Sequence, residues 1–149
     1  MNLRGLINIA SASLTASTTY NLVVCAAPSN QRIAITGFGF YGAYNAAATP
    51  GLLQFCKAAN AGSSPTATLT PFPLDPECTE TFQSTWTTTP STPPGTIVAA
   101  DSRYVNPQLG LTELWDDSNF IMIKGGGFFV LQFTPGQTTN YTGWLRINE

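Results

Sequence analysis

The chain has 149 residues with six basic and eight acidic side chains, and it contains no histidine. Charged residues make up 9% of the sequence, against roughly 25% in an ordinary soluble domain, while 43% of it is hydrophobic. Such a composition is typical of a part of an assembly or of a protein exposed outside a cell, because surface charge keeps free domains apart. The absence of histidine removes the commonest general base and the commonest metal ligand. Composition therefore argues against an enzyme and favours a structural or binding protein that needs no cofactor.

The charge pattern does not indicate binding to nucleic acid. The net charge is -2, and the basic residues are scattered along the sequence as Arg4, Arg32, Lys57, Arg103, Lys124 and Arg146. A surface that follows phosphates needs several basic residues together. No apolar run approaches the roughly 20 residues of a membrane helix, and the first residues lack the apolar core of a secretory signal. We therefore expect a protein made in the cytosol, with neither nucleic acid nor membrane as partner.

The three cysteines, Cys25, Cys56 and Cys78, are widely spaced. An odd number without a Cys-x-x-Cys pair argues against a disulfide framework and against a zinc site. Cys25 and Cys56 lie in apolar segments, where free cysteine usually behaves as a small hydrophobic residue. Cys78 lies in a polar, Pro-rich segment and is expected to be exposed.

Strand patterns dominate the chain and are separated by turn residues. In order, they occur at residues 3–9, 20–26, 31–41, 52–58, 66–70, 82–89, 120–124, 127–133 and 140–148. The pattern predicts one all-β domain over residues 1–149, an antiparallel β-sandwich or jelly roll of about eight strands with long Pro- and Thr-rich loops. Several strands are apolar on both faces, which predicts a sheet covered on both sides, the second cover being another subunit.

Three regions depart from this strand pattern. Residues 1–19 are interpreted as an N-terminal arm, because 11–19 form a small polar linker after the first strand. Residues 71–117 are interpreted as a loop-rich insertion, since prolines interrupt them repeatedly. Within that insertion, residues 111–115 carry the one short helical pattern.

Glycines mark two places where backbone must bend or lie close to another group. Gly37 and Gly39 alternate with aromatic residues and share one strand face, which predicts close approach by a neighbouring side chain or backbone. The three glycines at 125–127 predict a tight bend between two strands. They do not form a phosphate loop, because no Lys-Ser or Lys-Thr follows.

The candidate interface with another subunit or partner consists of aromatic, Arg and Thr side chains. They are Trp144, Arg146, Thr142, Arg32, Trp115, Trp86 and Tyr44. Trp144 alternates with Thr142 and Arg146 opposite the apolar face of the last strand, so it is either an aromatic anchor at an interface, where Trp and Arg are enriched, or a residue of a second core layer. Trp86 and Trp115 are either anchors or covers over the sandwich end. Arg32 either pairs with a carboxylate across an interface or bonds loop carbonyls of its own subunit.

Acidic residues cluster at 75–80 and at 113–117. Either cluster could supply oxygen ligands to Ca²⁺, but neither has the spacing of an EF-hand, so solvated loops are the simpler interpretation. A hydrolase with two catalytic carboxylates would need a defined pair and a sugar cleft. Nothing in the sequence selects such a pair, and no metal site is predicted.

Short motifs in both halves of the chain resemble tailed-bacteriophage structural proteins. An apolar-Pro-x-Asn-Gln-Arg pattern at residues 27–32 opens the long strand, and a Pro-led strand follows at 49–57. The C-terminal part adds the Gly-rich link at 125–127, the turn at 135–136 and a final strand that ends in Glu149. Together these features resemble the jelly-roll type of capsid decoration, or cement, protein over about two-thirds of the chain.

The resemblance implies a trimeric protein that sits on the outer surface of a phage head, in the virion, and binds the major capsid protein. It does not extend to residues 71–104, whose extra prolines and Trp86 depart from the pattern. The alternative is a carbohydrate- or receptor-binding β-sandwich of a phage tail or fibre, in which Trp86, Trp115 or Tyr44 would stack on sugar rings. In neither case is a free small-molecule ligand expected.

Overall fold

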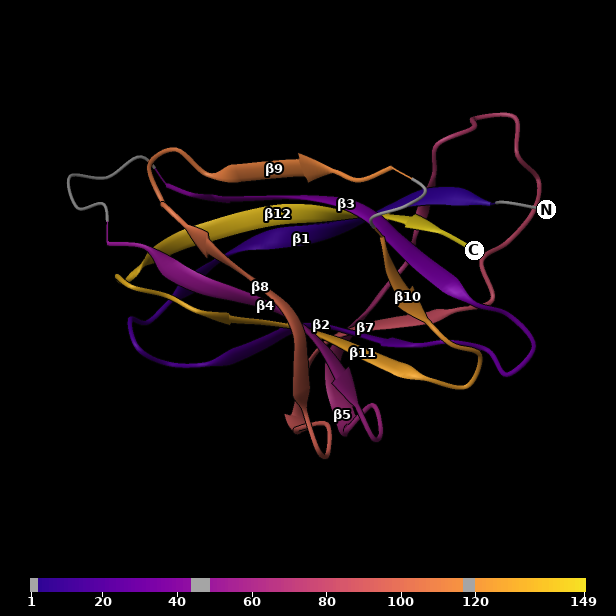
Figure 1. Cartoon of the computed structure of the whole chain (residues 1–149), viewed down its shortest axis with the longest axis horizontal. Helices are drawn as coiled ribbons and strands as arrows, with labels where there is room; N and C mark the ends of the chain where they lie inside the picture. Colours follow the sequence, from indigo (N-terminus) through magenta and orange to yellow (C-terminus); the bar gives the residue numbers. More distant parts are fainter. Residues whose placement is uncertain (1–2, 44–48, 117–119) are drawn as a thin grey trace.

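A computed structural model describes residues 3–43, 49–116 and 120–149. These residues form two antiparallel sheets that pack face to face, and no helix occurs among them (Figure 1). The all-β sandwich predicted from the strand pattern is therefore confirmed. The twelve strands found in the described residues exceed the predicted eight. Accordingly, this part of the chain contains no helix of the length and hydropathy needed to cross a membrane.

Sheet A has the strand order β10-β3-β12-β1-β6, and β9 also pairs with β3 on the side of β10. Its strands are β1 (Arg4–Leu14), β3 (Ile33–Gly42), β6 (Phe72–Pro73), β9 (Leu111–Leu114), β10 (Ile121–Ile123) and β12 (Thr139–Asn148). One edge of the sheet is thus β6, and the opposite edge consists of β9 and β10.

Sheet B has the strand order β5-β7-β2-β11-β4-β8. Its strands are β2 (Tyr20–Ala26), β4 (Gly51–Ala58), β5 (Ser63–Leu69), β7 (Thr85–Thr92), β8 (Val98–Val105) and β11 (Phe128–Thr134). The apolar strands β2, β11 and β4 lie in the middle, whereas the mostly exposed strands β5 and β8 form the edges.

The core lies between the two sheets and follows from the two-residue period of each strand. In β12, Tyr141, Leu145 and Ile147 are buried on one face, whereas Thr142, Trp144 and Arg146 face outward. Aromatic rings contact one another between the sheets. Phe40 of β3 packs on Phe133 of β11 with ring centroids 4.6 Å apart, in the edge-to-face arrangement that aromatic pairs prefer.

A second, smaller cluster covers the outer face of sheet B. Val24, Cys56 and Val130 are buried there, with Ala61 and Ile97 packed against them. The covering residues belong to the loops 59–62 and 93–97, which are held together by hydrogen bonds to the Asn60 side chain. The chain itself therefore supplies the second cover at this position, where the sequence suggested another subunit.

The three irregular regions turn out to carry strands. Residues 4–14 form β1, which pairs with β12 inside sheet A instead of extending as an arm. The segment 71–117 contributes β6, β7, β8 and β9 in its described part. The short helix expected at 111–115 is wrong: Leu111–Leu114 pair with β3 as the strand β9, and their burial alternates as in a strand.

Candidate interaction surface

A row of side chains crosses the outer face of sheet A, because five strands place them in register. Phe72 of β6 pairs with Leu6 of β1, and Leu6 pairs with Arg146 of β12. Arg146 in turn lies opposite Gly37 of β3, which pairs with Leu114 of β9. We call this surface the sheet-A face and define it by Leu6, Phe72, Leu74, Leu114, Trp144 and Arg146.

Trp144 lies flat against the sheet because its neighbour has no side chain. A Cβ atom placed on Gly39, its partner in β3, would lie within 2.6 Å of Trp144 Cε2. Leu114 lies close over Gly37 in the same way. The predicted close approach at the two glycines is thus confirmed, and it leaves Trp144 half-buried, with part of its ring open to solvent.

Several large apolar side chains of the sheet-A face are exposed to solvent. Phe72 is 65% exposed and Leu114 is 62% exposed, with Leu74 beside them also open to solvent. Leu6, Leu74, Leu114 and Trp144 line a shallow hollow of about 420 Å³ together with Arg146. Contiguous apolar patches rimmed by polar groups are typical of interaction sites, whereas single exposed apolar residues are common everywhere.

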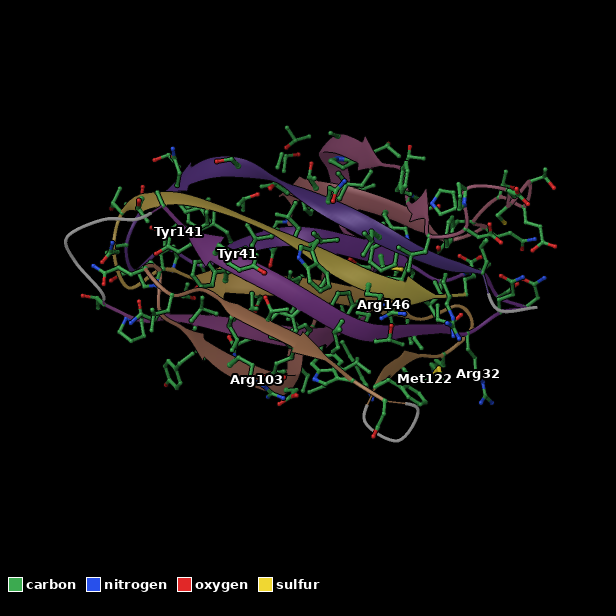
Figure 2. The ribbon with its side chains drawn as sticks, turned by 90° about the horizontal axis from the view of Figure 1, so that it is seen from above. Arg32, Tyr41, Arg103, Met122, Tyr141 and Arg146 are labelled. Atoms are coloured by element: carbon green, nitrogen blue, oxygen red, sulfur yellow. The ribbon has the colours of Figure 1, made fainter. Side chains whose placement is uncertain are left out.

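Arg146 lies at the centre of this face, as Figure 2 shows on the ribbon of β12. It also lines a polar hollow with Arg4, Thr36 and Asn148. Among the described residues, neither Arg146 nor Arg4 has a carboxylate within ion-pair distance. Asn148 Oδ1 is buried there without a hydrogen-bond partner. Asp75 and Glu80 line a neighbouring hollow with both arginines but form no ion pair with them, and a guanidinium without such a partner can bind a carboxylate through two parallel hydrogen bonds.

The structure brings together three of the seven predicted interface residues on one strand, and Trp115 lines the polar hollow beside one of them, Arg146. Thr142, Trp144 and Arg146 share the outward side of β12, and the Thr142 hydroxyl donates to the Ile9 carbonyl oxygen at 2.9 Å. Arg32 is exposed just before β3, at the end of sheet A where β10 lies (Figure 2). Tyr44 lies outside the described residues.

Trp86 is not an exposed anchor, because its side chain is 0% exposed in the core. Its indole N–H donates to Ser84 Oγ at 2.8 Å, and that hydroxyl donates to Glu149 Oε2 at 2.6 Å. The Glu149 carboxylate also accepts the backbone N–H of Gln83 at 2.7 Å. Trp86 therefore anchors the C-terminal residue to the start of β7, and it cannot stack on a sugar as the alternative function requires.

Trp115 also belongs mainly to the interior. Its ring packs on Phe38 and Phe55, at 5.6 and 5.5 Å between centroids, and its N–H donates to Glu113 Oε2 at 2.9 Å. Glu113 also accepts from Arg103 Nε at 2.9 Å, which joins β9 to β8 across the two sheets. The side chain of Trp115 thus closes the sandwich here and is not an open binding ring.

Carboxylates hold Arg103 from two sides. Hydrogen bonds to Glu113 and Asp101 raise the pKa of Arg103 above its usual value. Since both oxygens of Glu113 accept from Arg103 Nε, the acidic cluster at 113–117 is engaged in an ion pair at Glu113. Within the ranges that the structure describes, no three His, Cys, Asp or Glu side chains come together as a metal site.

Sequence reasoning missed four residues of the sheet-A face: Leu6, Phe72, Leu74 and Leu114. Leu6 alternates with buried residues in β1, so its outward position could have been found from the period of that strand. The other three lie in the region 71–117, at positions outside the one strand predicted there, residues 82–89. Their membership of one surface follows from the pairing of β6 and β9 with distant strands.

Comparisons of the chain with protein-family models, with curated proteins and with solved structures found no match.

Proposed function

We propose that the chain is a non-enzymatic structural protein of a tailed-phage virion, a decoration protein that binds the outside of the head and bridges capsomers. In this proposal it is made in the host cytoplasm, associates with copies of itself as a trimer and has the major capsid protein as its partner. The observation that carries the proposal is the sheet-A face: exposed apolar side chains around an arginine that forms no ion pair with a described residue, in a chain where charge is scarce.

The chemistry of that face suits a permanent docking site. Trp144 and Arg146 are residue types enriched among the strongest contacts of protein interfaces, and apolar neighbours surround both. Five hydrogen-bonded strands hold the face rigid, so that little conformational entropy is lost on binding. A decoration protein needs only modest affinity per contact, because symmetry repeats each contact over the shell and the binding free energy exists only in the assembled lattice.

The test is binding to expanded heads built from the major capsid protein encoded in the same genome. We expect the chain to co-sediment with these heads and to raise the temperature at which they disrupt. Trp144→Ala combined with Leu114→Ser should weaken binding about tenfold or more, since it removes two central apolar contacts. Tyr104→Ser is the matched control, because Tyr104 is 75% exposed on β8, away from this face.

Two results would count against the proposal. If the wild-type chain does not bind heads at all, the decoration function is wrong. If it binds but the sheet-A variant binds as well as the Tyr104→Ser control, the face named here is not the contact. Both variants must keep the thermal unfolding of the wild-type chain, which establishes that they are folded.

A further inference from the structure

A second hollow lies at the β10 edge of the molecule. It has a volume of about 420 Å³ and opens between β10 of sheet A and the neighbouring ends of β4 and β11 of sheet B. Its apolar lining includes Ile121, Met122 and Phe128. We call it the β10 hollow; Figure 2 shows Met122 and Arg32 close together at this end of the molecule.

Positive charge gathers around this hollow. Arg32, Lys57 and Lys124 line it, which is half of the six basic residues of the chain, and no carboxylate does. All three side chains are exposed, and in the described part of the chain none has an acidic group within ion-pair distance. A net charge of +3 here in a chain of net charge -2 leaves -5 for the rest of the molecule.

The complementary surface is the segment of residues 72–80, which comprises β6 and the loop after it. It carries Asp75, Glu77 and Glu80, all exposed, and the ion pairs formed among described residues include none of them. The exposed side chains of Phe72 and Leu74 lie beside these acids. The segment thus presents three negative charges next to apolar side chains, as the β10 hollow presents three positive charges around an apolar lining.

The segment also has a preformed shape. Pro73 and Pro76 restrict its backbone, and the Asp75 side chain accepts the N–H of Glu77 at 3.0 Å, which fixes the turn after Leu74. A segment that is ordered before it binds loses less conformational entropy on docking. It is therefore suited to insert into a hollow of another molecule.

The two surfaces lie at opposite edges of sheet A. The segment 72–80 extends from the β6 edge, and the hollow lies at the β10 edge, with β3, β12 and β1 between them. Four strand spacings separate these edges by roughly 19 Å, and Figure 2 shows the loop after β6 on the side away from Met122 and Arg32. Glu80, at the end of the segment, shares a hollow with Gln31, the residue before Arg32, but among the described residues no ion pair joins the two surfaces within one chain. A neighbouring copy can supply the missing partner.

We propose that residues 72–80 of one copy dock in the β10 hollow of the next copy, so that the chain associates head to tail. Phe72 and Leu74 contact the apolar lining, and the acidic side chains pair with Arg32, Lys57 and Lys124. A contact between two different surfaces of the same protein closes into a ring or continues as a filament. Through this contact the copies would associate with one another in the proposed function. The biological role of the contact therefore rests on that function.

Two other arrangements are less favourable. In its own chain, the segment lies beside a hollow with Arg4 and Arg146, yet Asp75 and Glu80 form no ion pair with them. A symmetric contact between two sheet-A faces would place the uncompensated Arg146 side chains near one another, where like charges repel. The head-to-tail contact pairs opposite charges, uses the Phe72 and Leu74 edge of the sheet-A face, and leaves its Leu114, Trp144 and Arg146 part free for the shell.

The first test measures the mass of the purified full chain by light scattering over a range of concentrations. We expect an oligomer that Lys57→Glu with Lys124→Glu dissociates, with the dissociation constant raised about tenfold or more. Glu77→Lys with Glu80→Lys should have the same effect from the other side of the contact. All four substitutions combined in one chain should restore association, because each surface is then reversed. Ser11→Glu with Ser13→Glu, two exposed positions in the second half of β1, is the control for added charge and should leave the oligomer unchanged.

A second test uses the native Cys78 as a reporter. Cys25 and Cys56 are buried, so Cys78 is the accessible thiol of the three. In Met122→Cys, diamide should join Cys78 of one copy to the new thiol of the next, accepting the two electrons and two protons that the thiols release. Leu109→Cys, on another exposed site, should not form this bond. This test reads proximity directly and needs no charge reversal.

The outcomes separate this inference from the proposed function, because no capsid is present in either test. A wild-type chain that stays monomeric, or an oligomer that is insensitive to both reversals, overturns the inference. Equal cross-linking through Leu109→Cys and Met122→Cys also overturns it. A charge-dependent oligomer that does not bind heads overturns the decoration function instead and leaves the head-to-tail contact standing.

Discussion

The hydrogen-bonded chain from Trp86 through Ser84 to Glu149 allows a sharp test of the fold. Ser84 is 8% exposed and bridges a fully buried indole N–H and a carboxylate. In Ser84→Ala the buried indole N–H loses its acceptor, which costs about 1–3 kcal/mol. The carboxylate loses one donor but keeps the backbone N–H groups of Gln83 and residue 84, so the second loss is about 1 kcal/mol.

The expected total is about 2–4 kcal/mol of unfolding free energy, or a fall in Tm of roughly 4–16 °C for a chain of this size. Urea unfolding and calorimetry measure both quantities. Ser13→Ala, an exposed serine on β1, is the control and should change stability by less than about 0.5 kcal/mol. In a Trp86→Phe background, which has no indole N–H, Ser84→Ala should cost less. An equal cost in both backgrounds would refute the reasoning.

Two further changes test the glycine contact and the buried thiols. Gly39→Ala should destabilise by about 1–3 kcal/mol and should change the fluorescence of Trp144, whose ring must move away from the new methyl group; an unchanged Tm and spectrum would contradict this. Burial raises the pKa of Cys25 above its usual value and that of Cys56 to about 11. Each thiol has a higher pKa in the folded chain than in the unfolded chain. The free energy of unfolding is therefore constant below about pH 9 and decreases from pH 9 to 11 by about 1.4 kcal/mol per pH unit for each thiol. Ellman's reagent should label Cys78 alone in the native chain near pH 8, and all three thiols after unfolding; flat stability to pH 11 would exclude this effect.

The strands with one buried face were predictable from the sequence because their period is two. In the last strand, the sequence separates Trp144 and Arg146 from Tyr141, Leu145 and Ile147, and the structure has the same two faces. Gly37 and Gly39 were informative for a related reason, since a missing Cβ in a strand has to be matched by something that approaches closely.

The edge strands were not predictable in the same way. β8 carries Asp101 and Arg103 and is mostly exposed, so it lacks an apolar alternation. β9 has four residues, too few for a period to distinguish a strand from a helical turn. Both elements are specified by pairing with β4 and β3, that is, by tertiary contacts that no local pattern contains. The sheet-A face depends on one of these strands, which is why Leu114 was missed.

For Trp86, the composition of the segment suggested exposure, although the alternation of the strand already indicated burial. Its surroundings are rich in Thr and Pro, which suggested an exposed site. The alternation Thr85, Trp86, Thr87 nevertheless places the indole on one side of the strand and the two hydroxyl groups on the other. In the structure the indole side is the core. Alternation within a strand is therefore a better guide to burial than the polarity of the segment.

The basic residues show the opposite relation between sequence and space. Arg32, Lys57 and Lys124 are 25 and 67 residues apart along the sequence, so that they look scattered there. The pairing of β3 with β10 and of β11 with β4 brings them to one hollow. In a chain with six basic residues, few other groups can substitute for those three. Reversing two of them removes most of the local positive potential, so the charge-reversal test discriminates more strongly here than it would on an ordinary, densely charged surface.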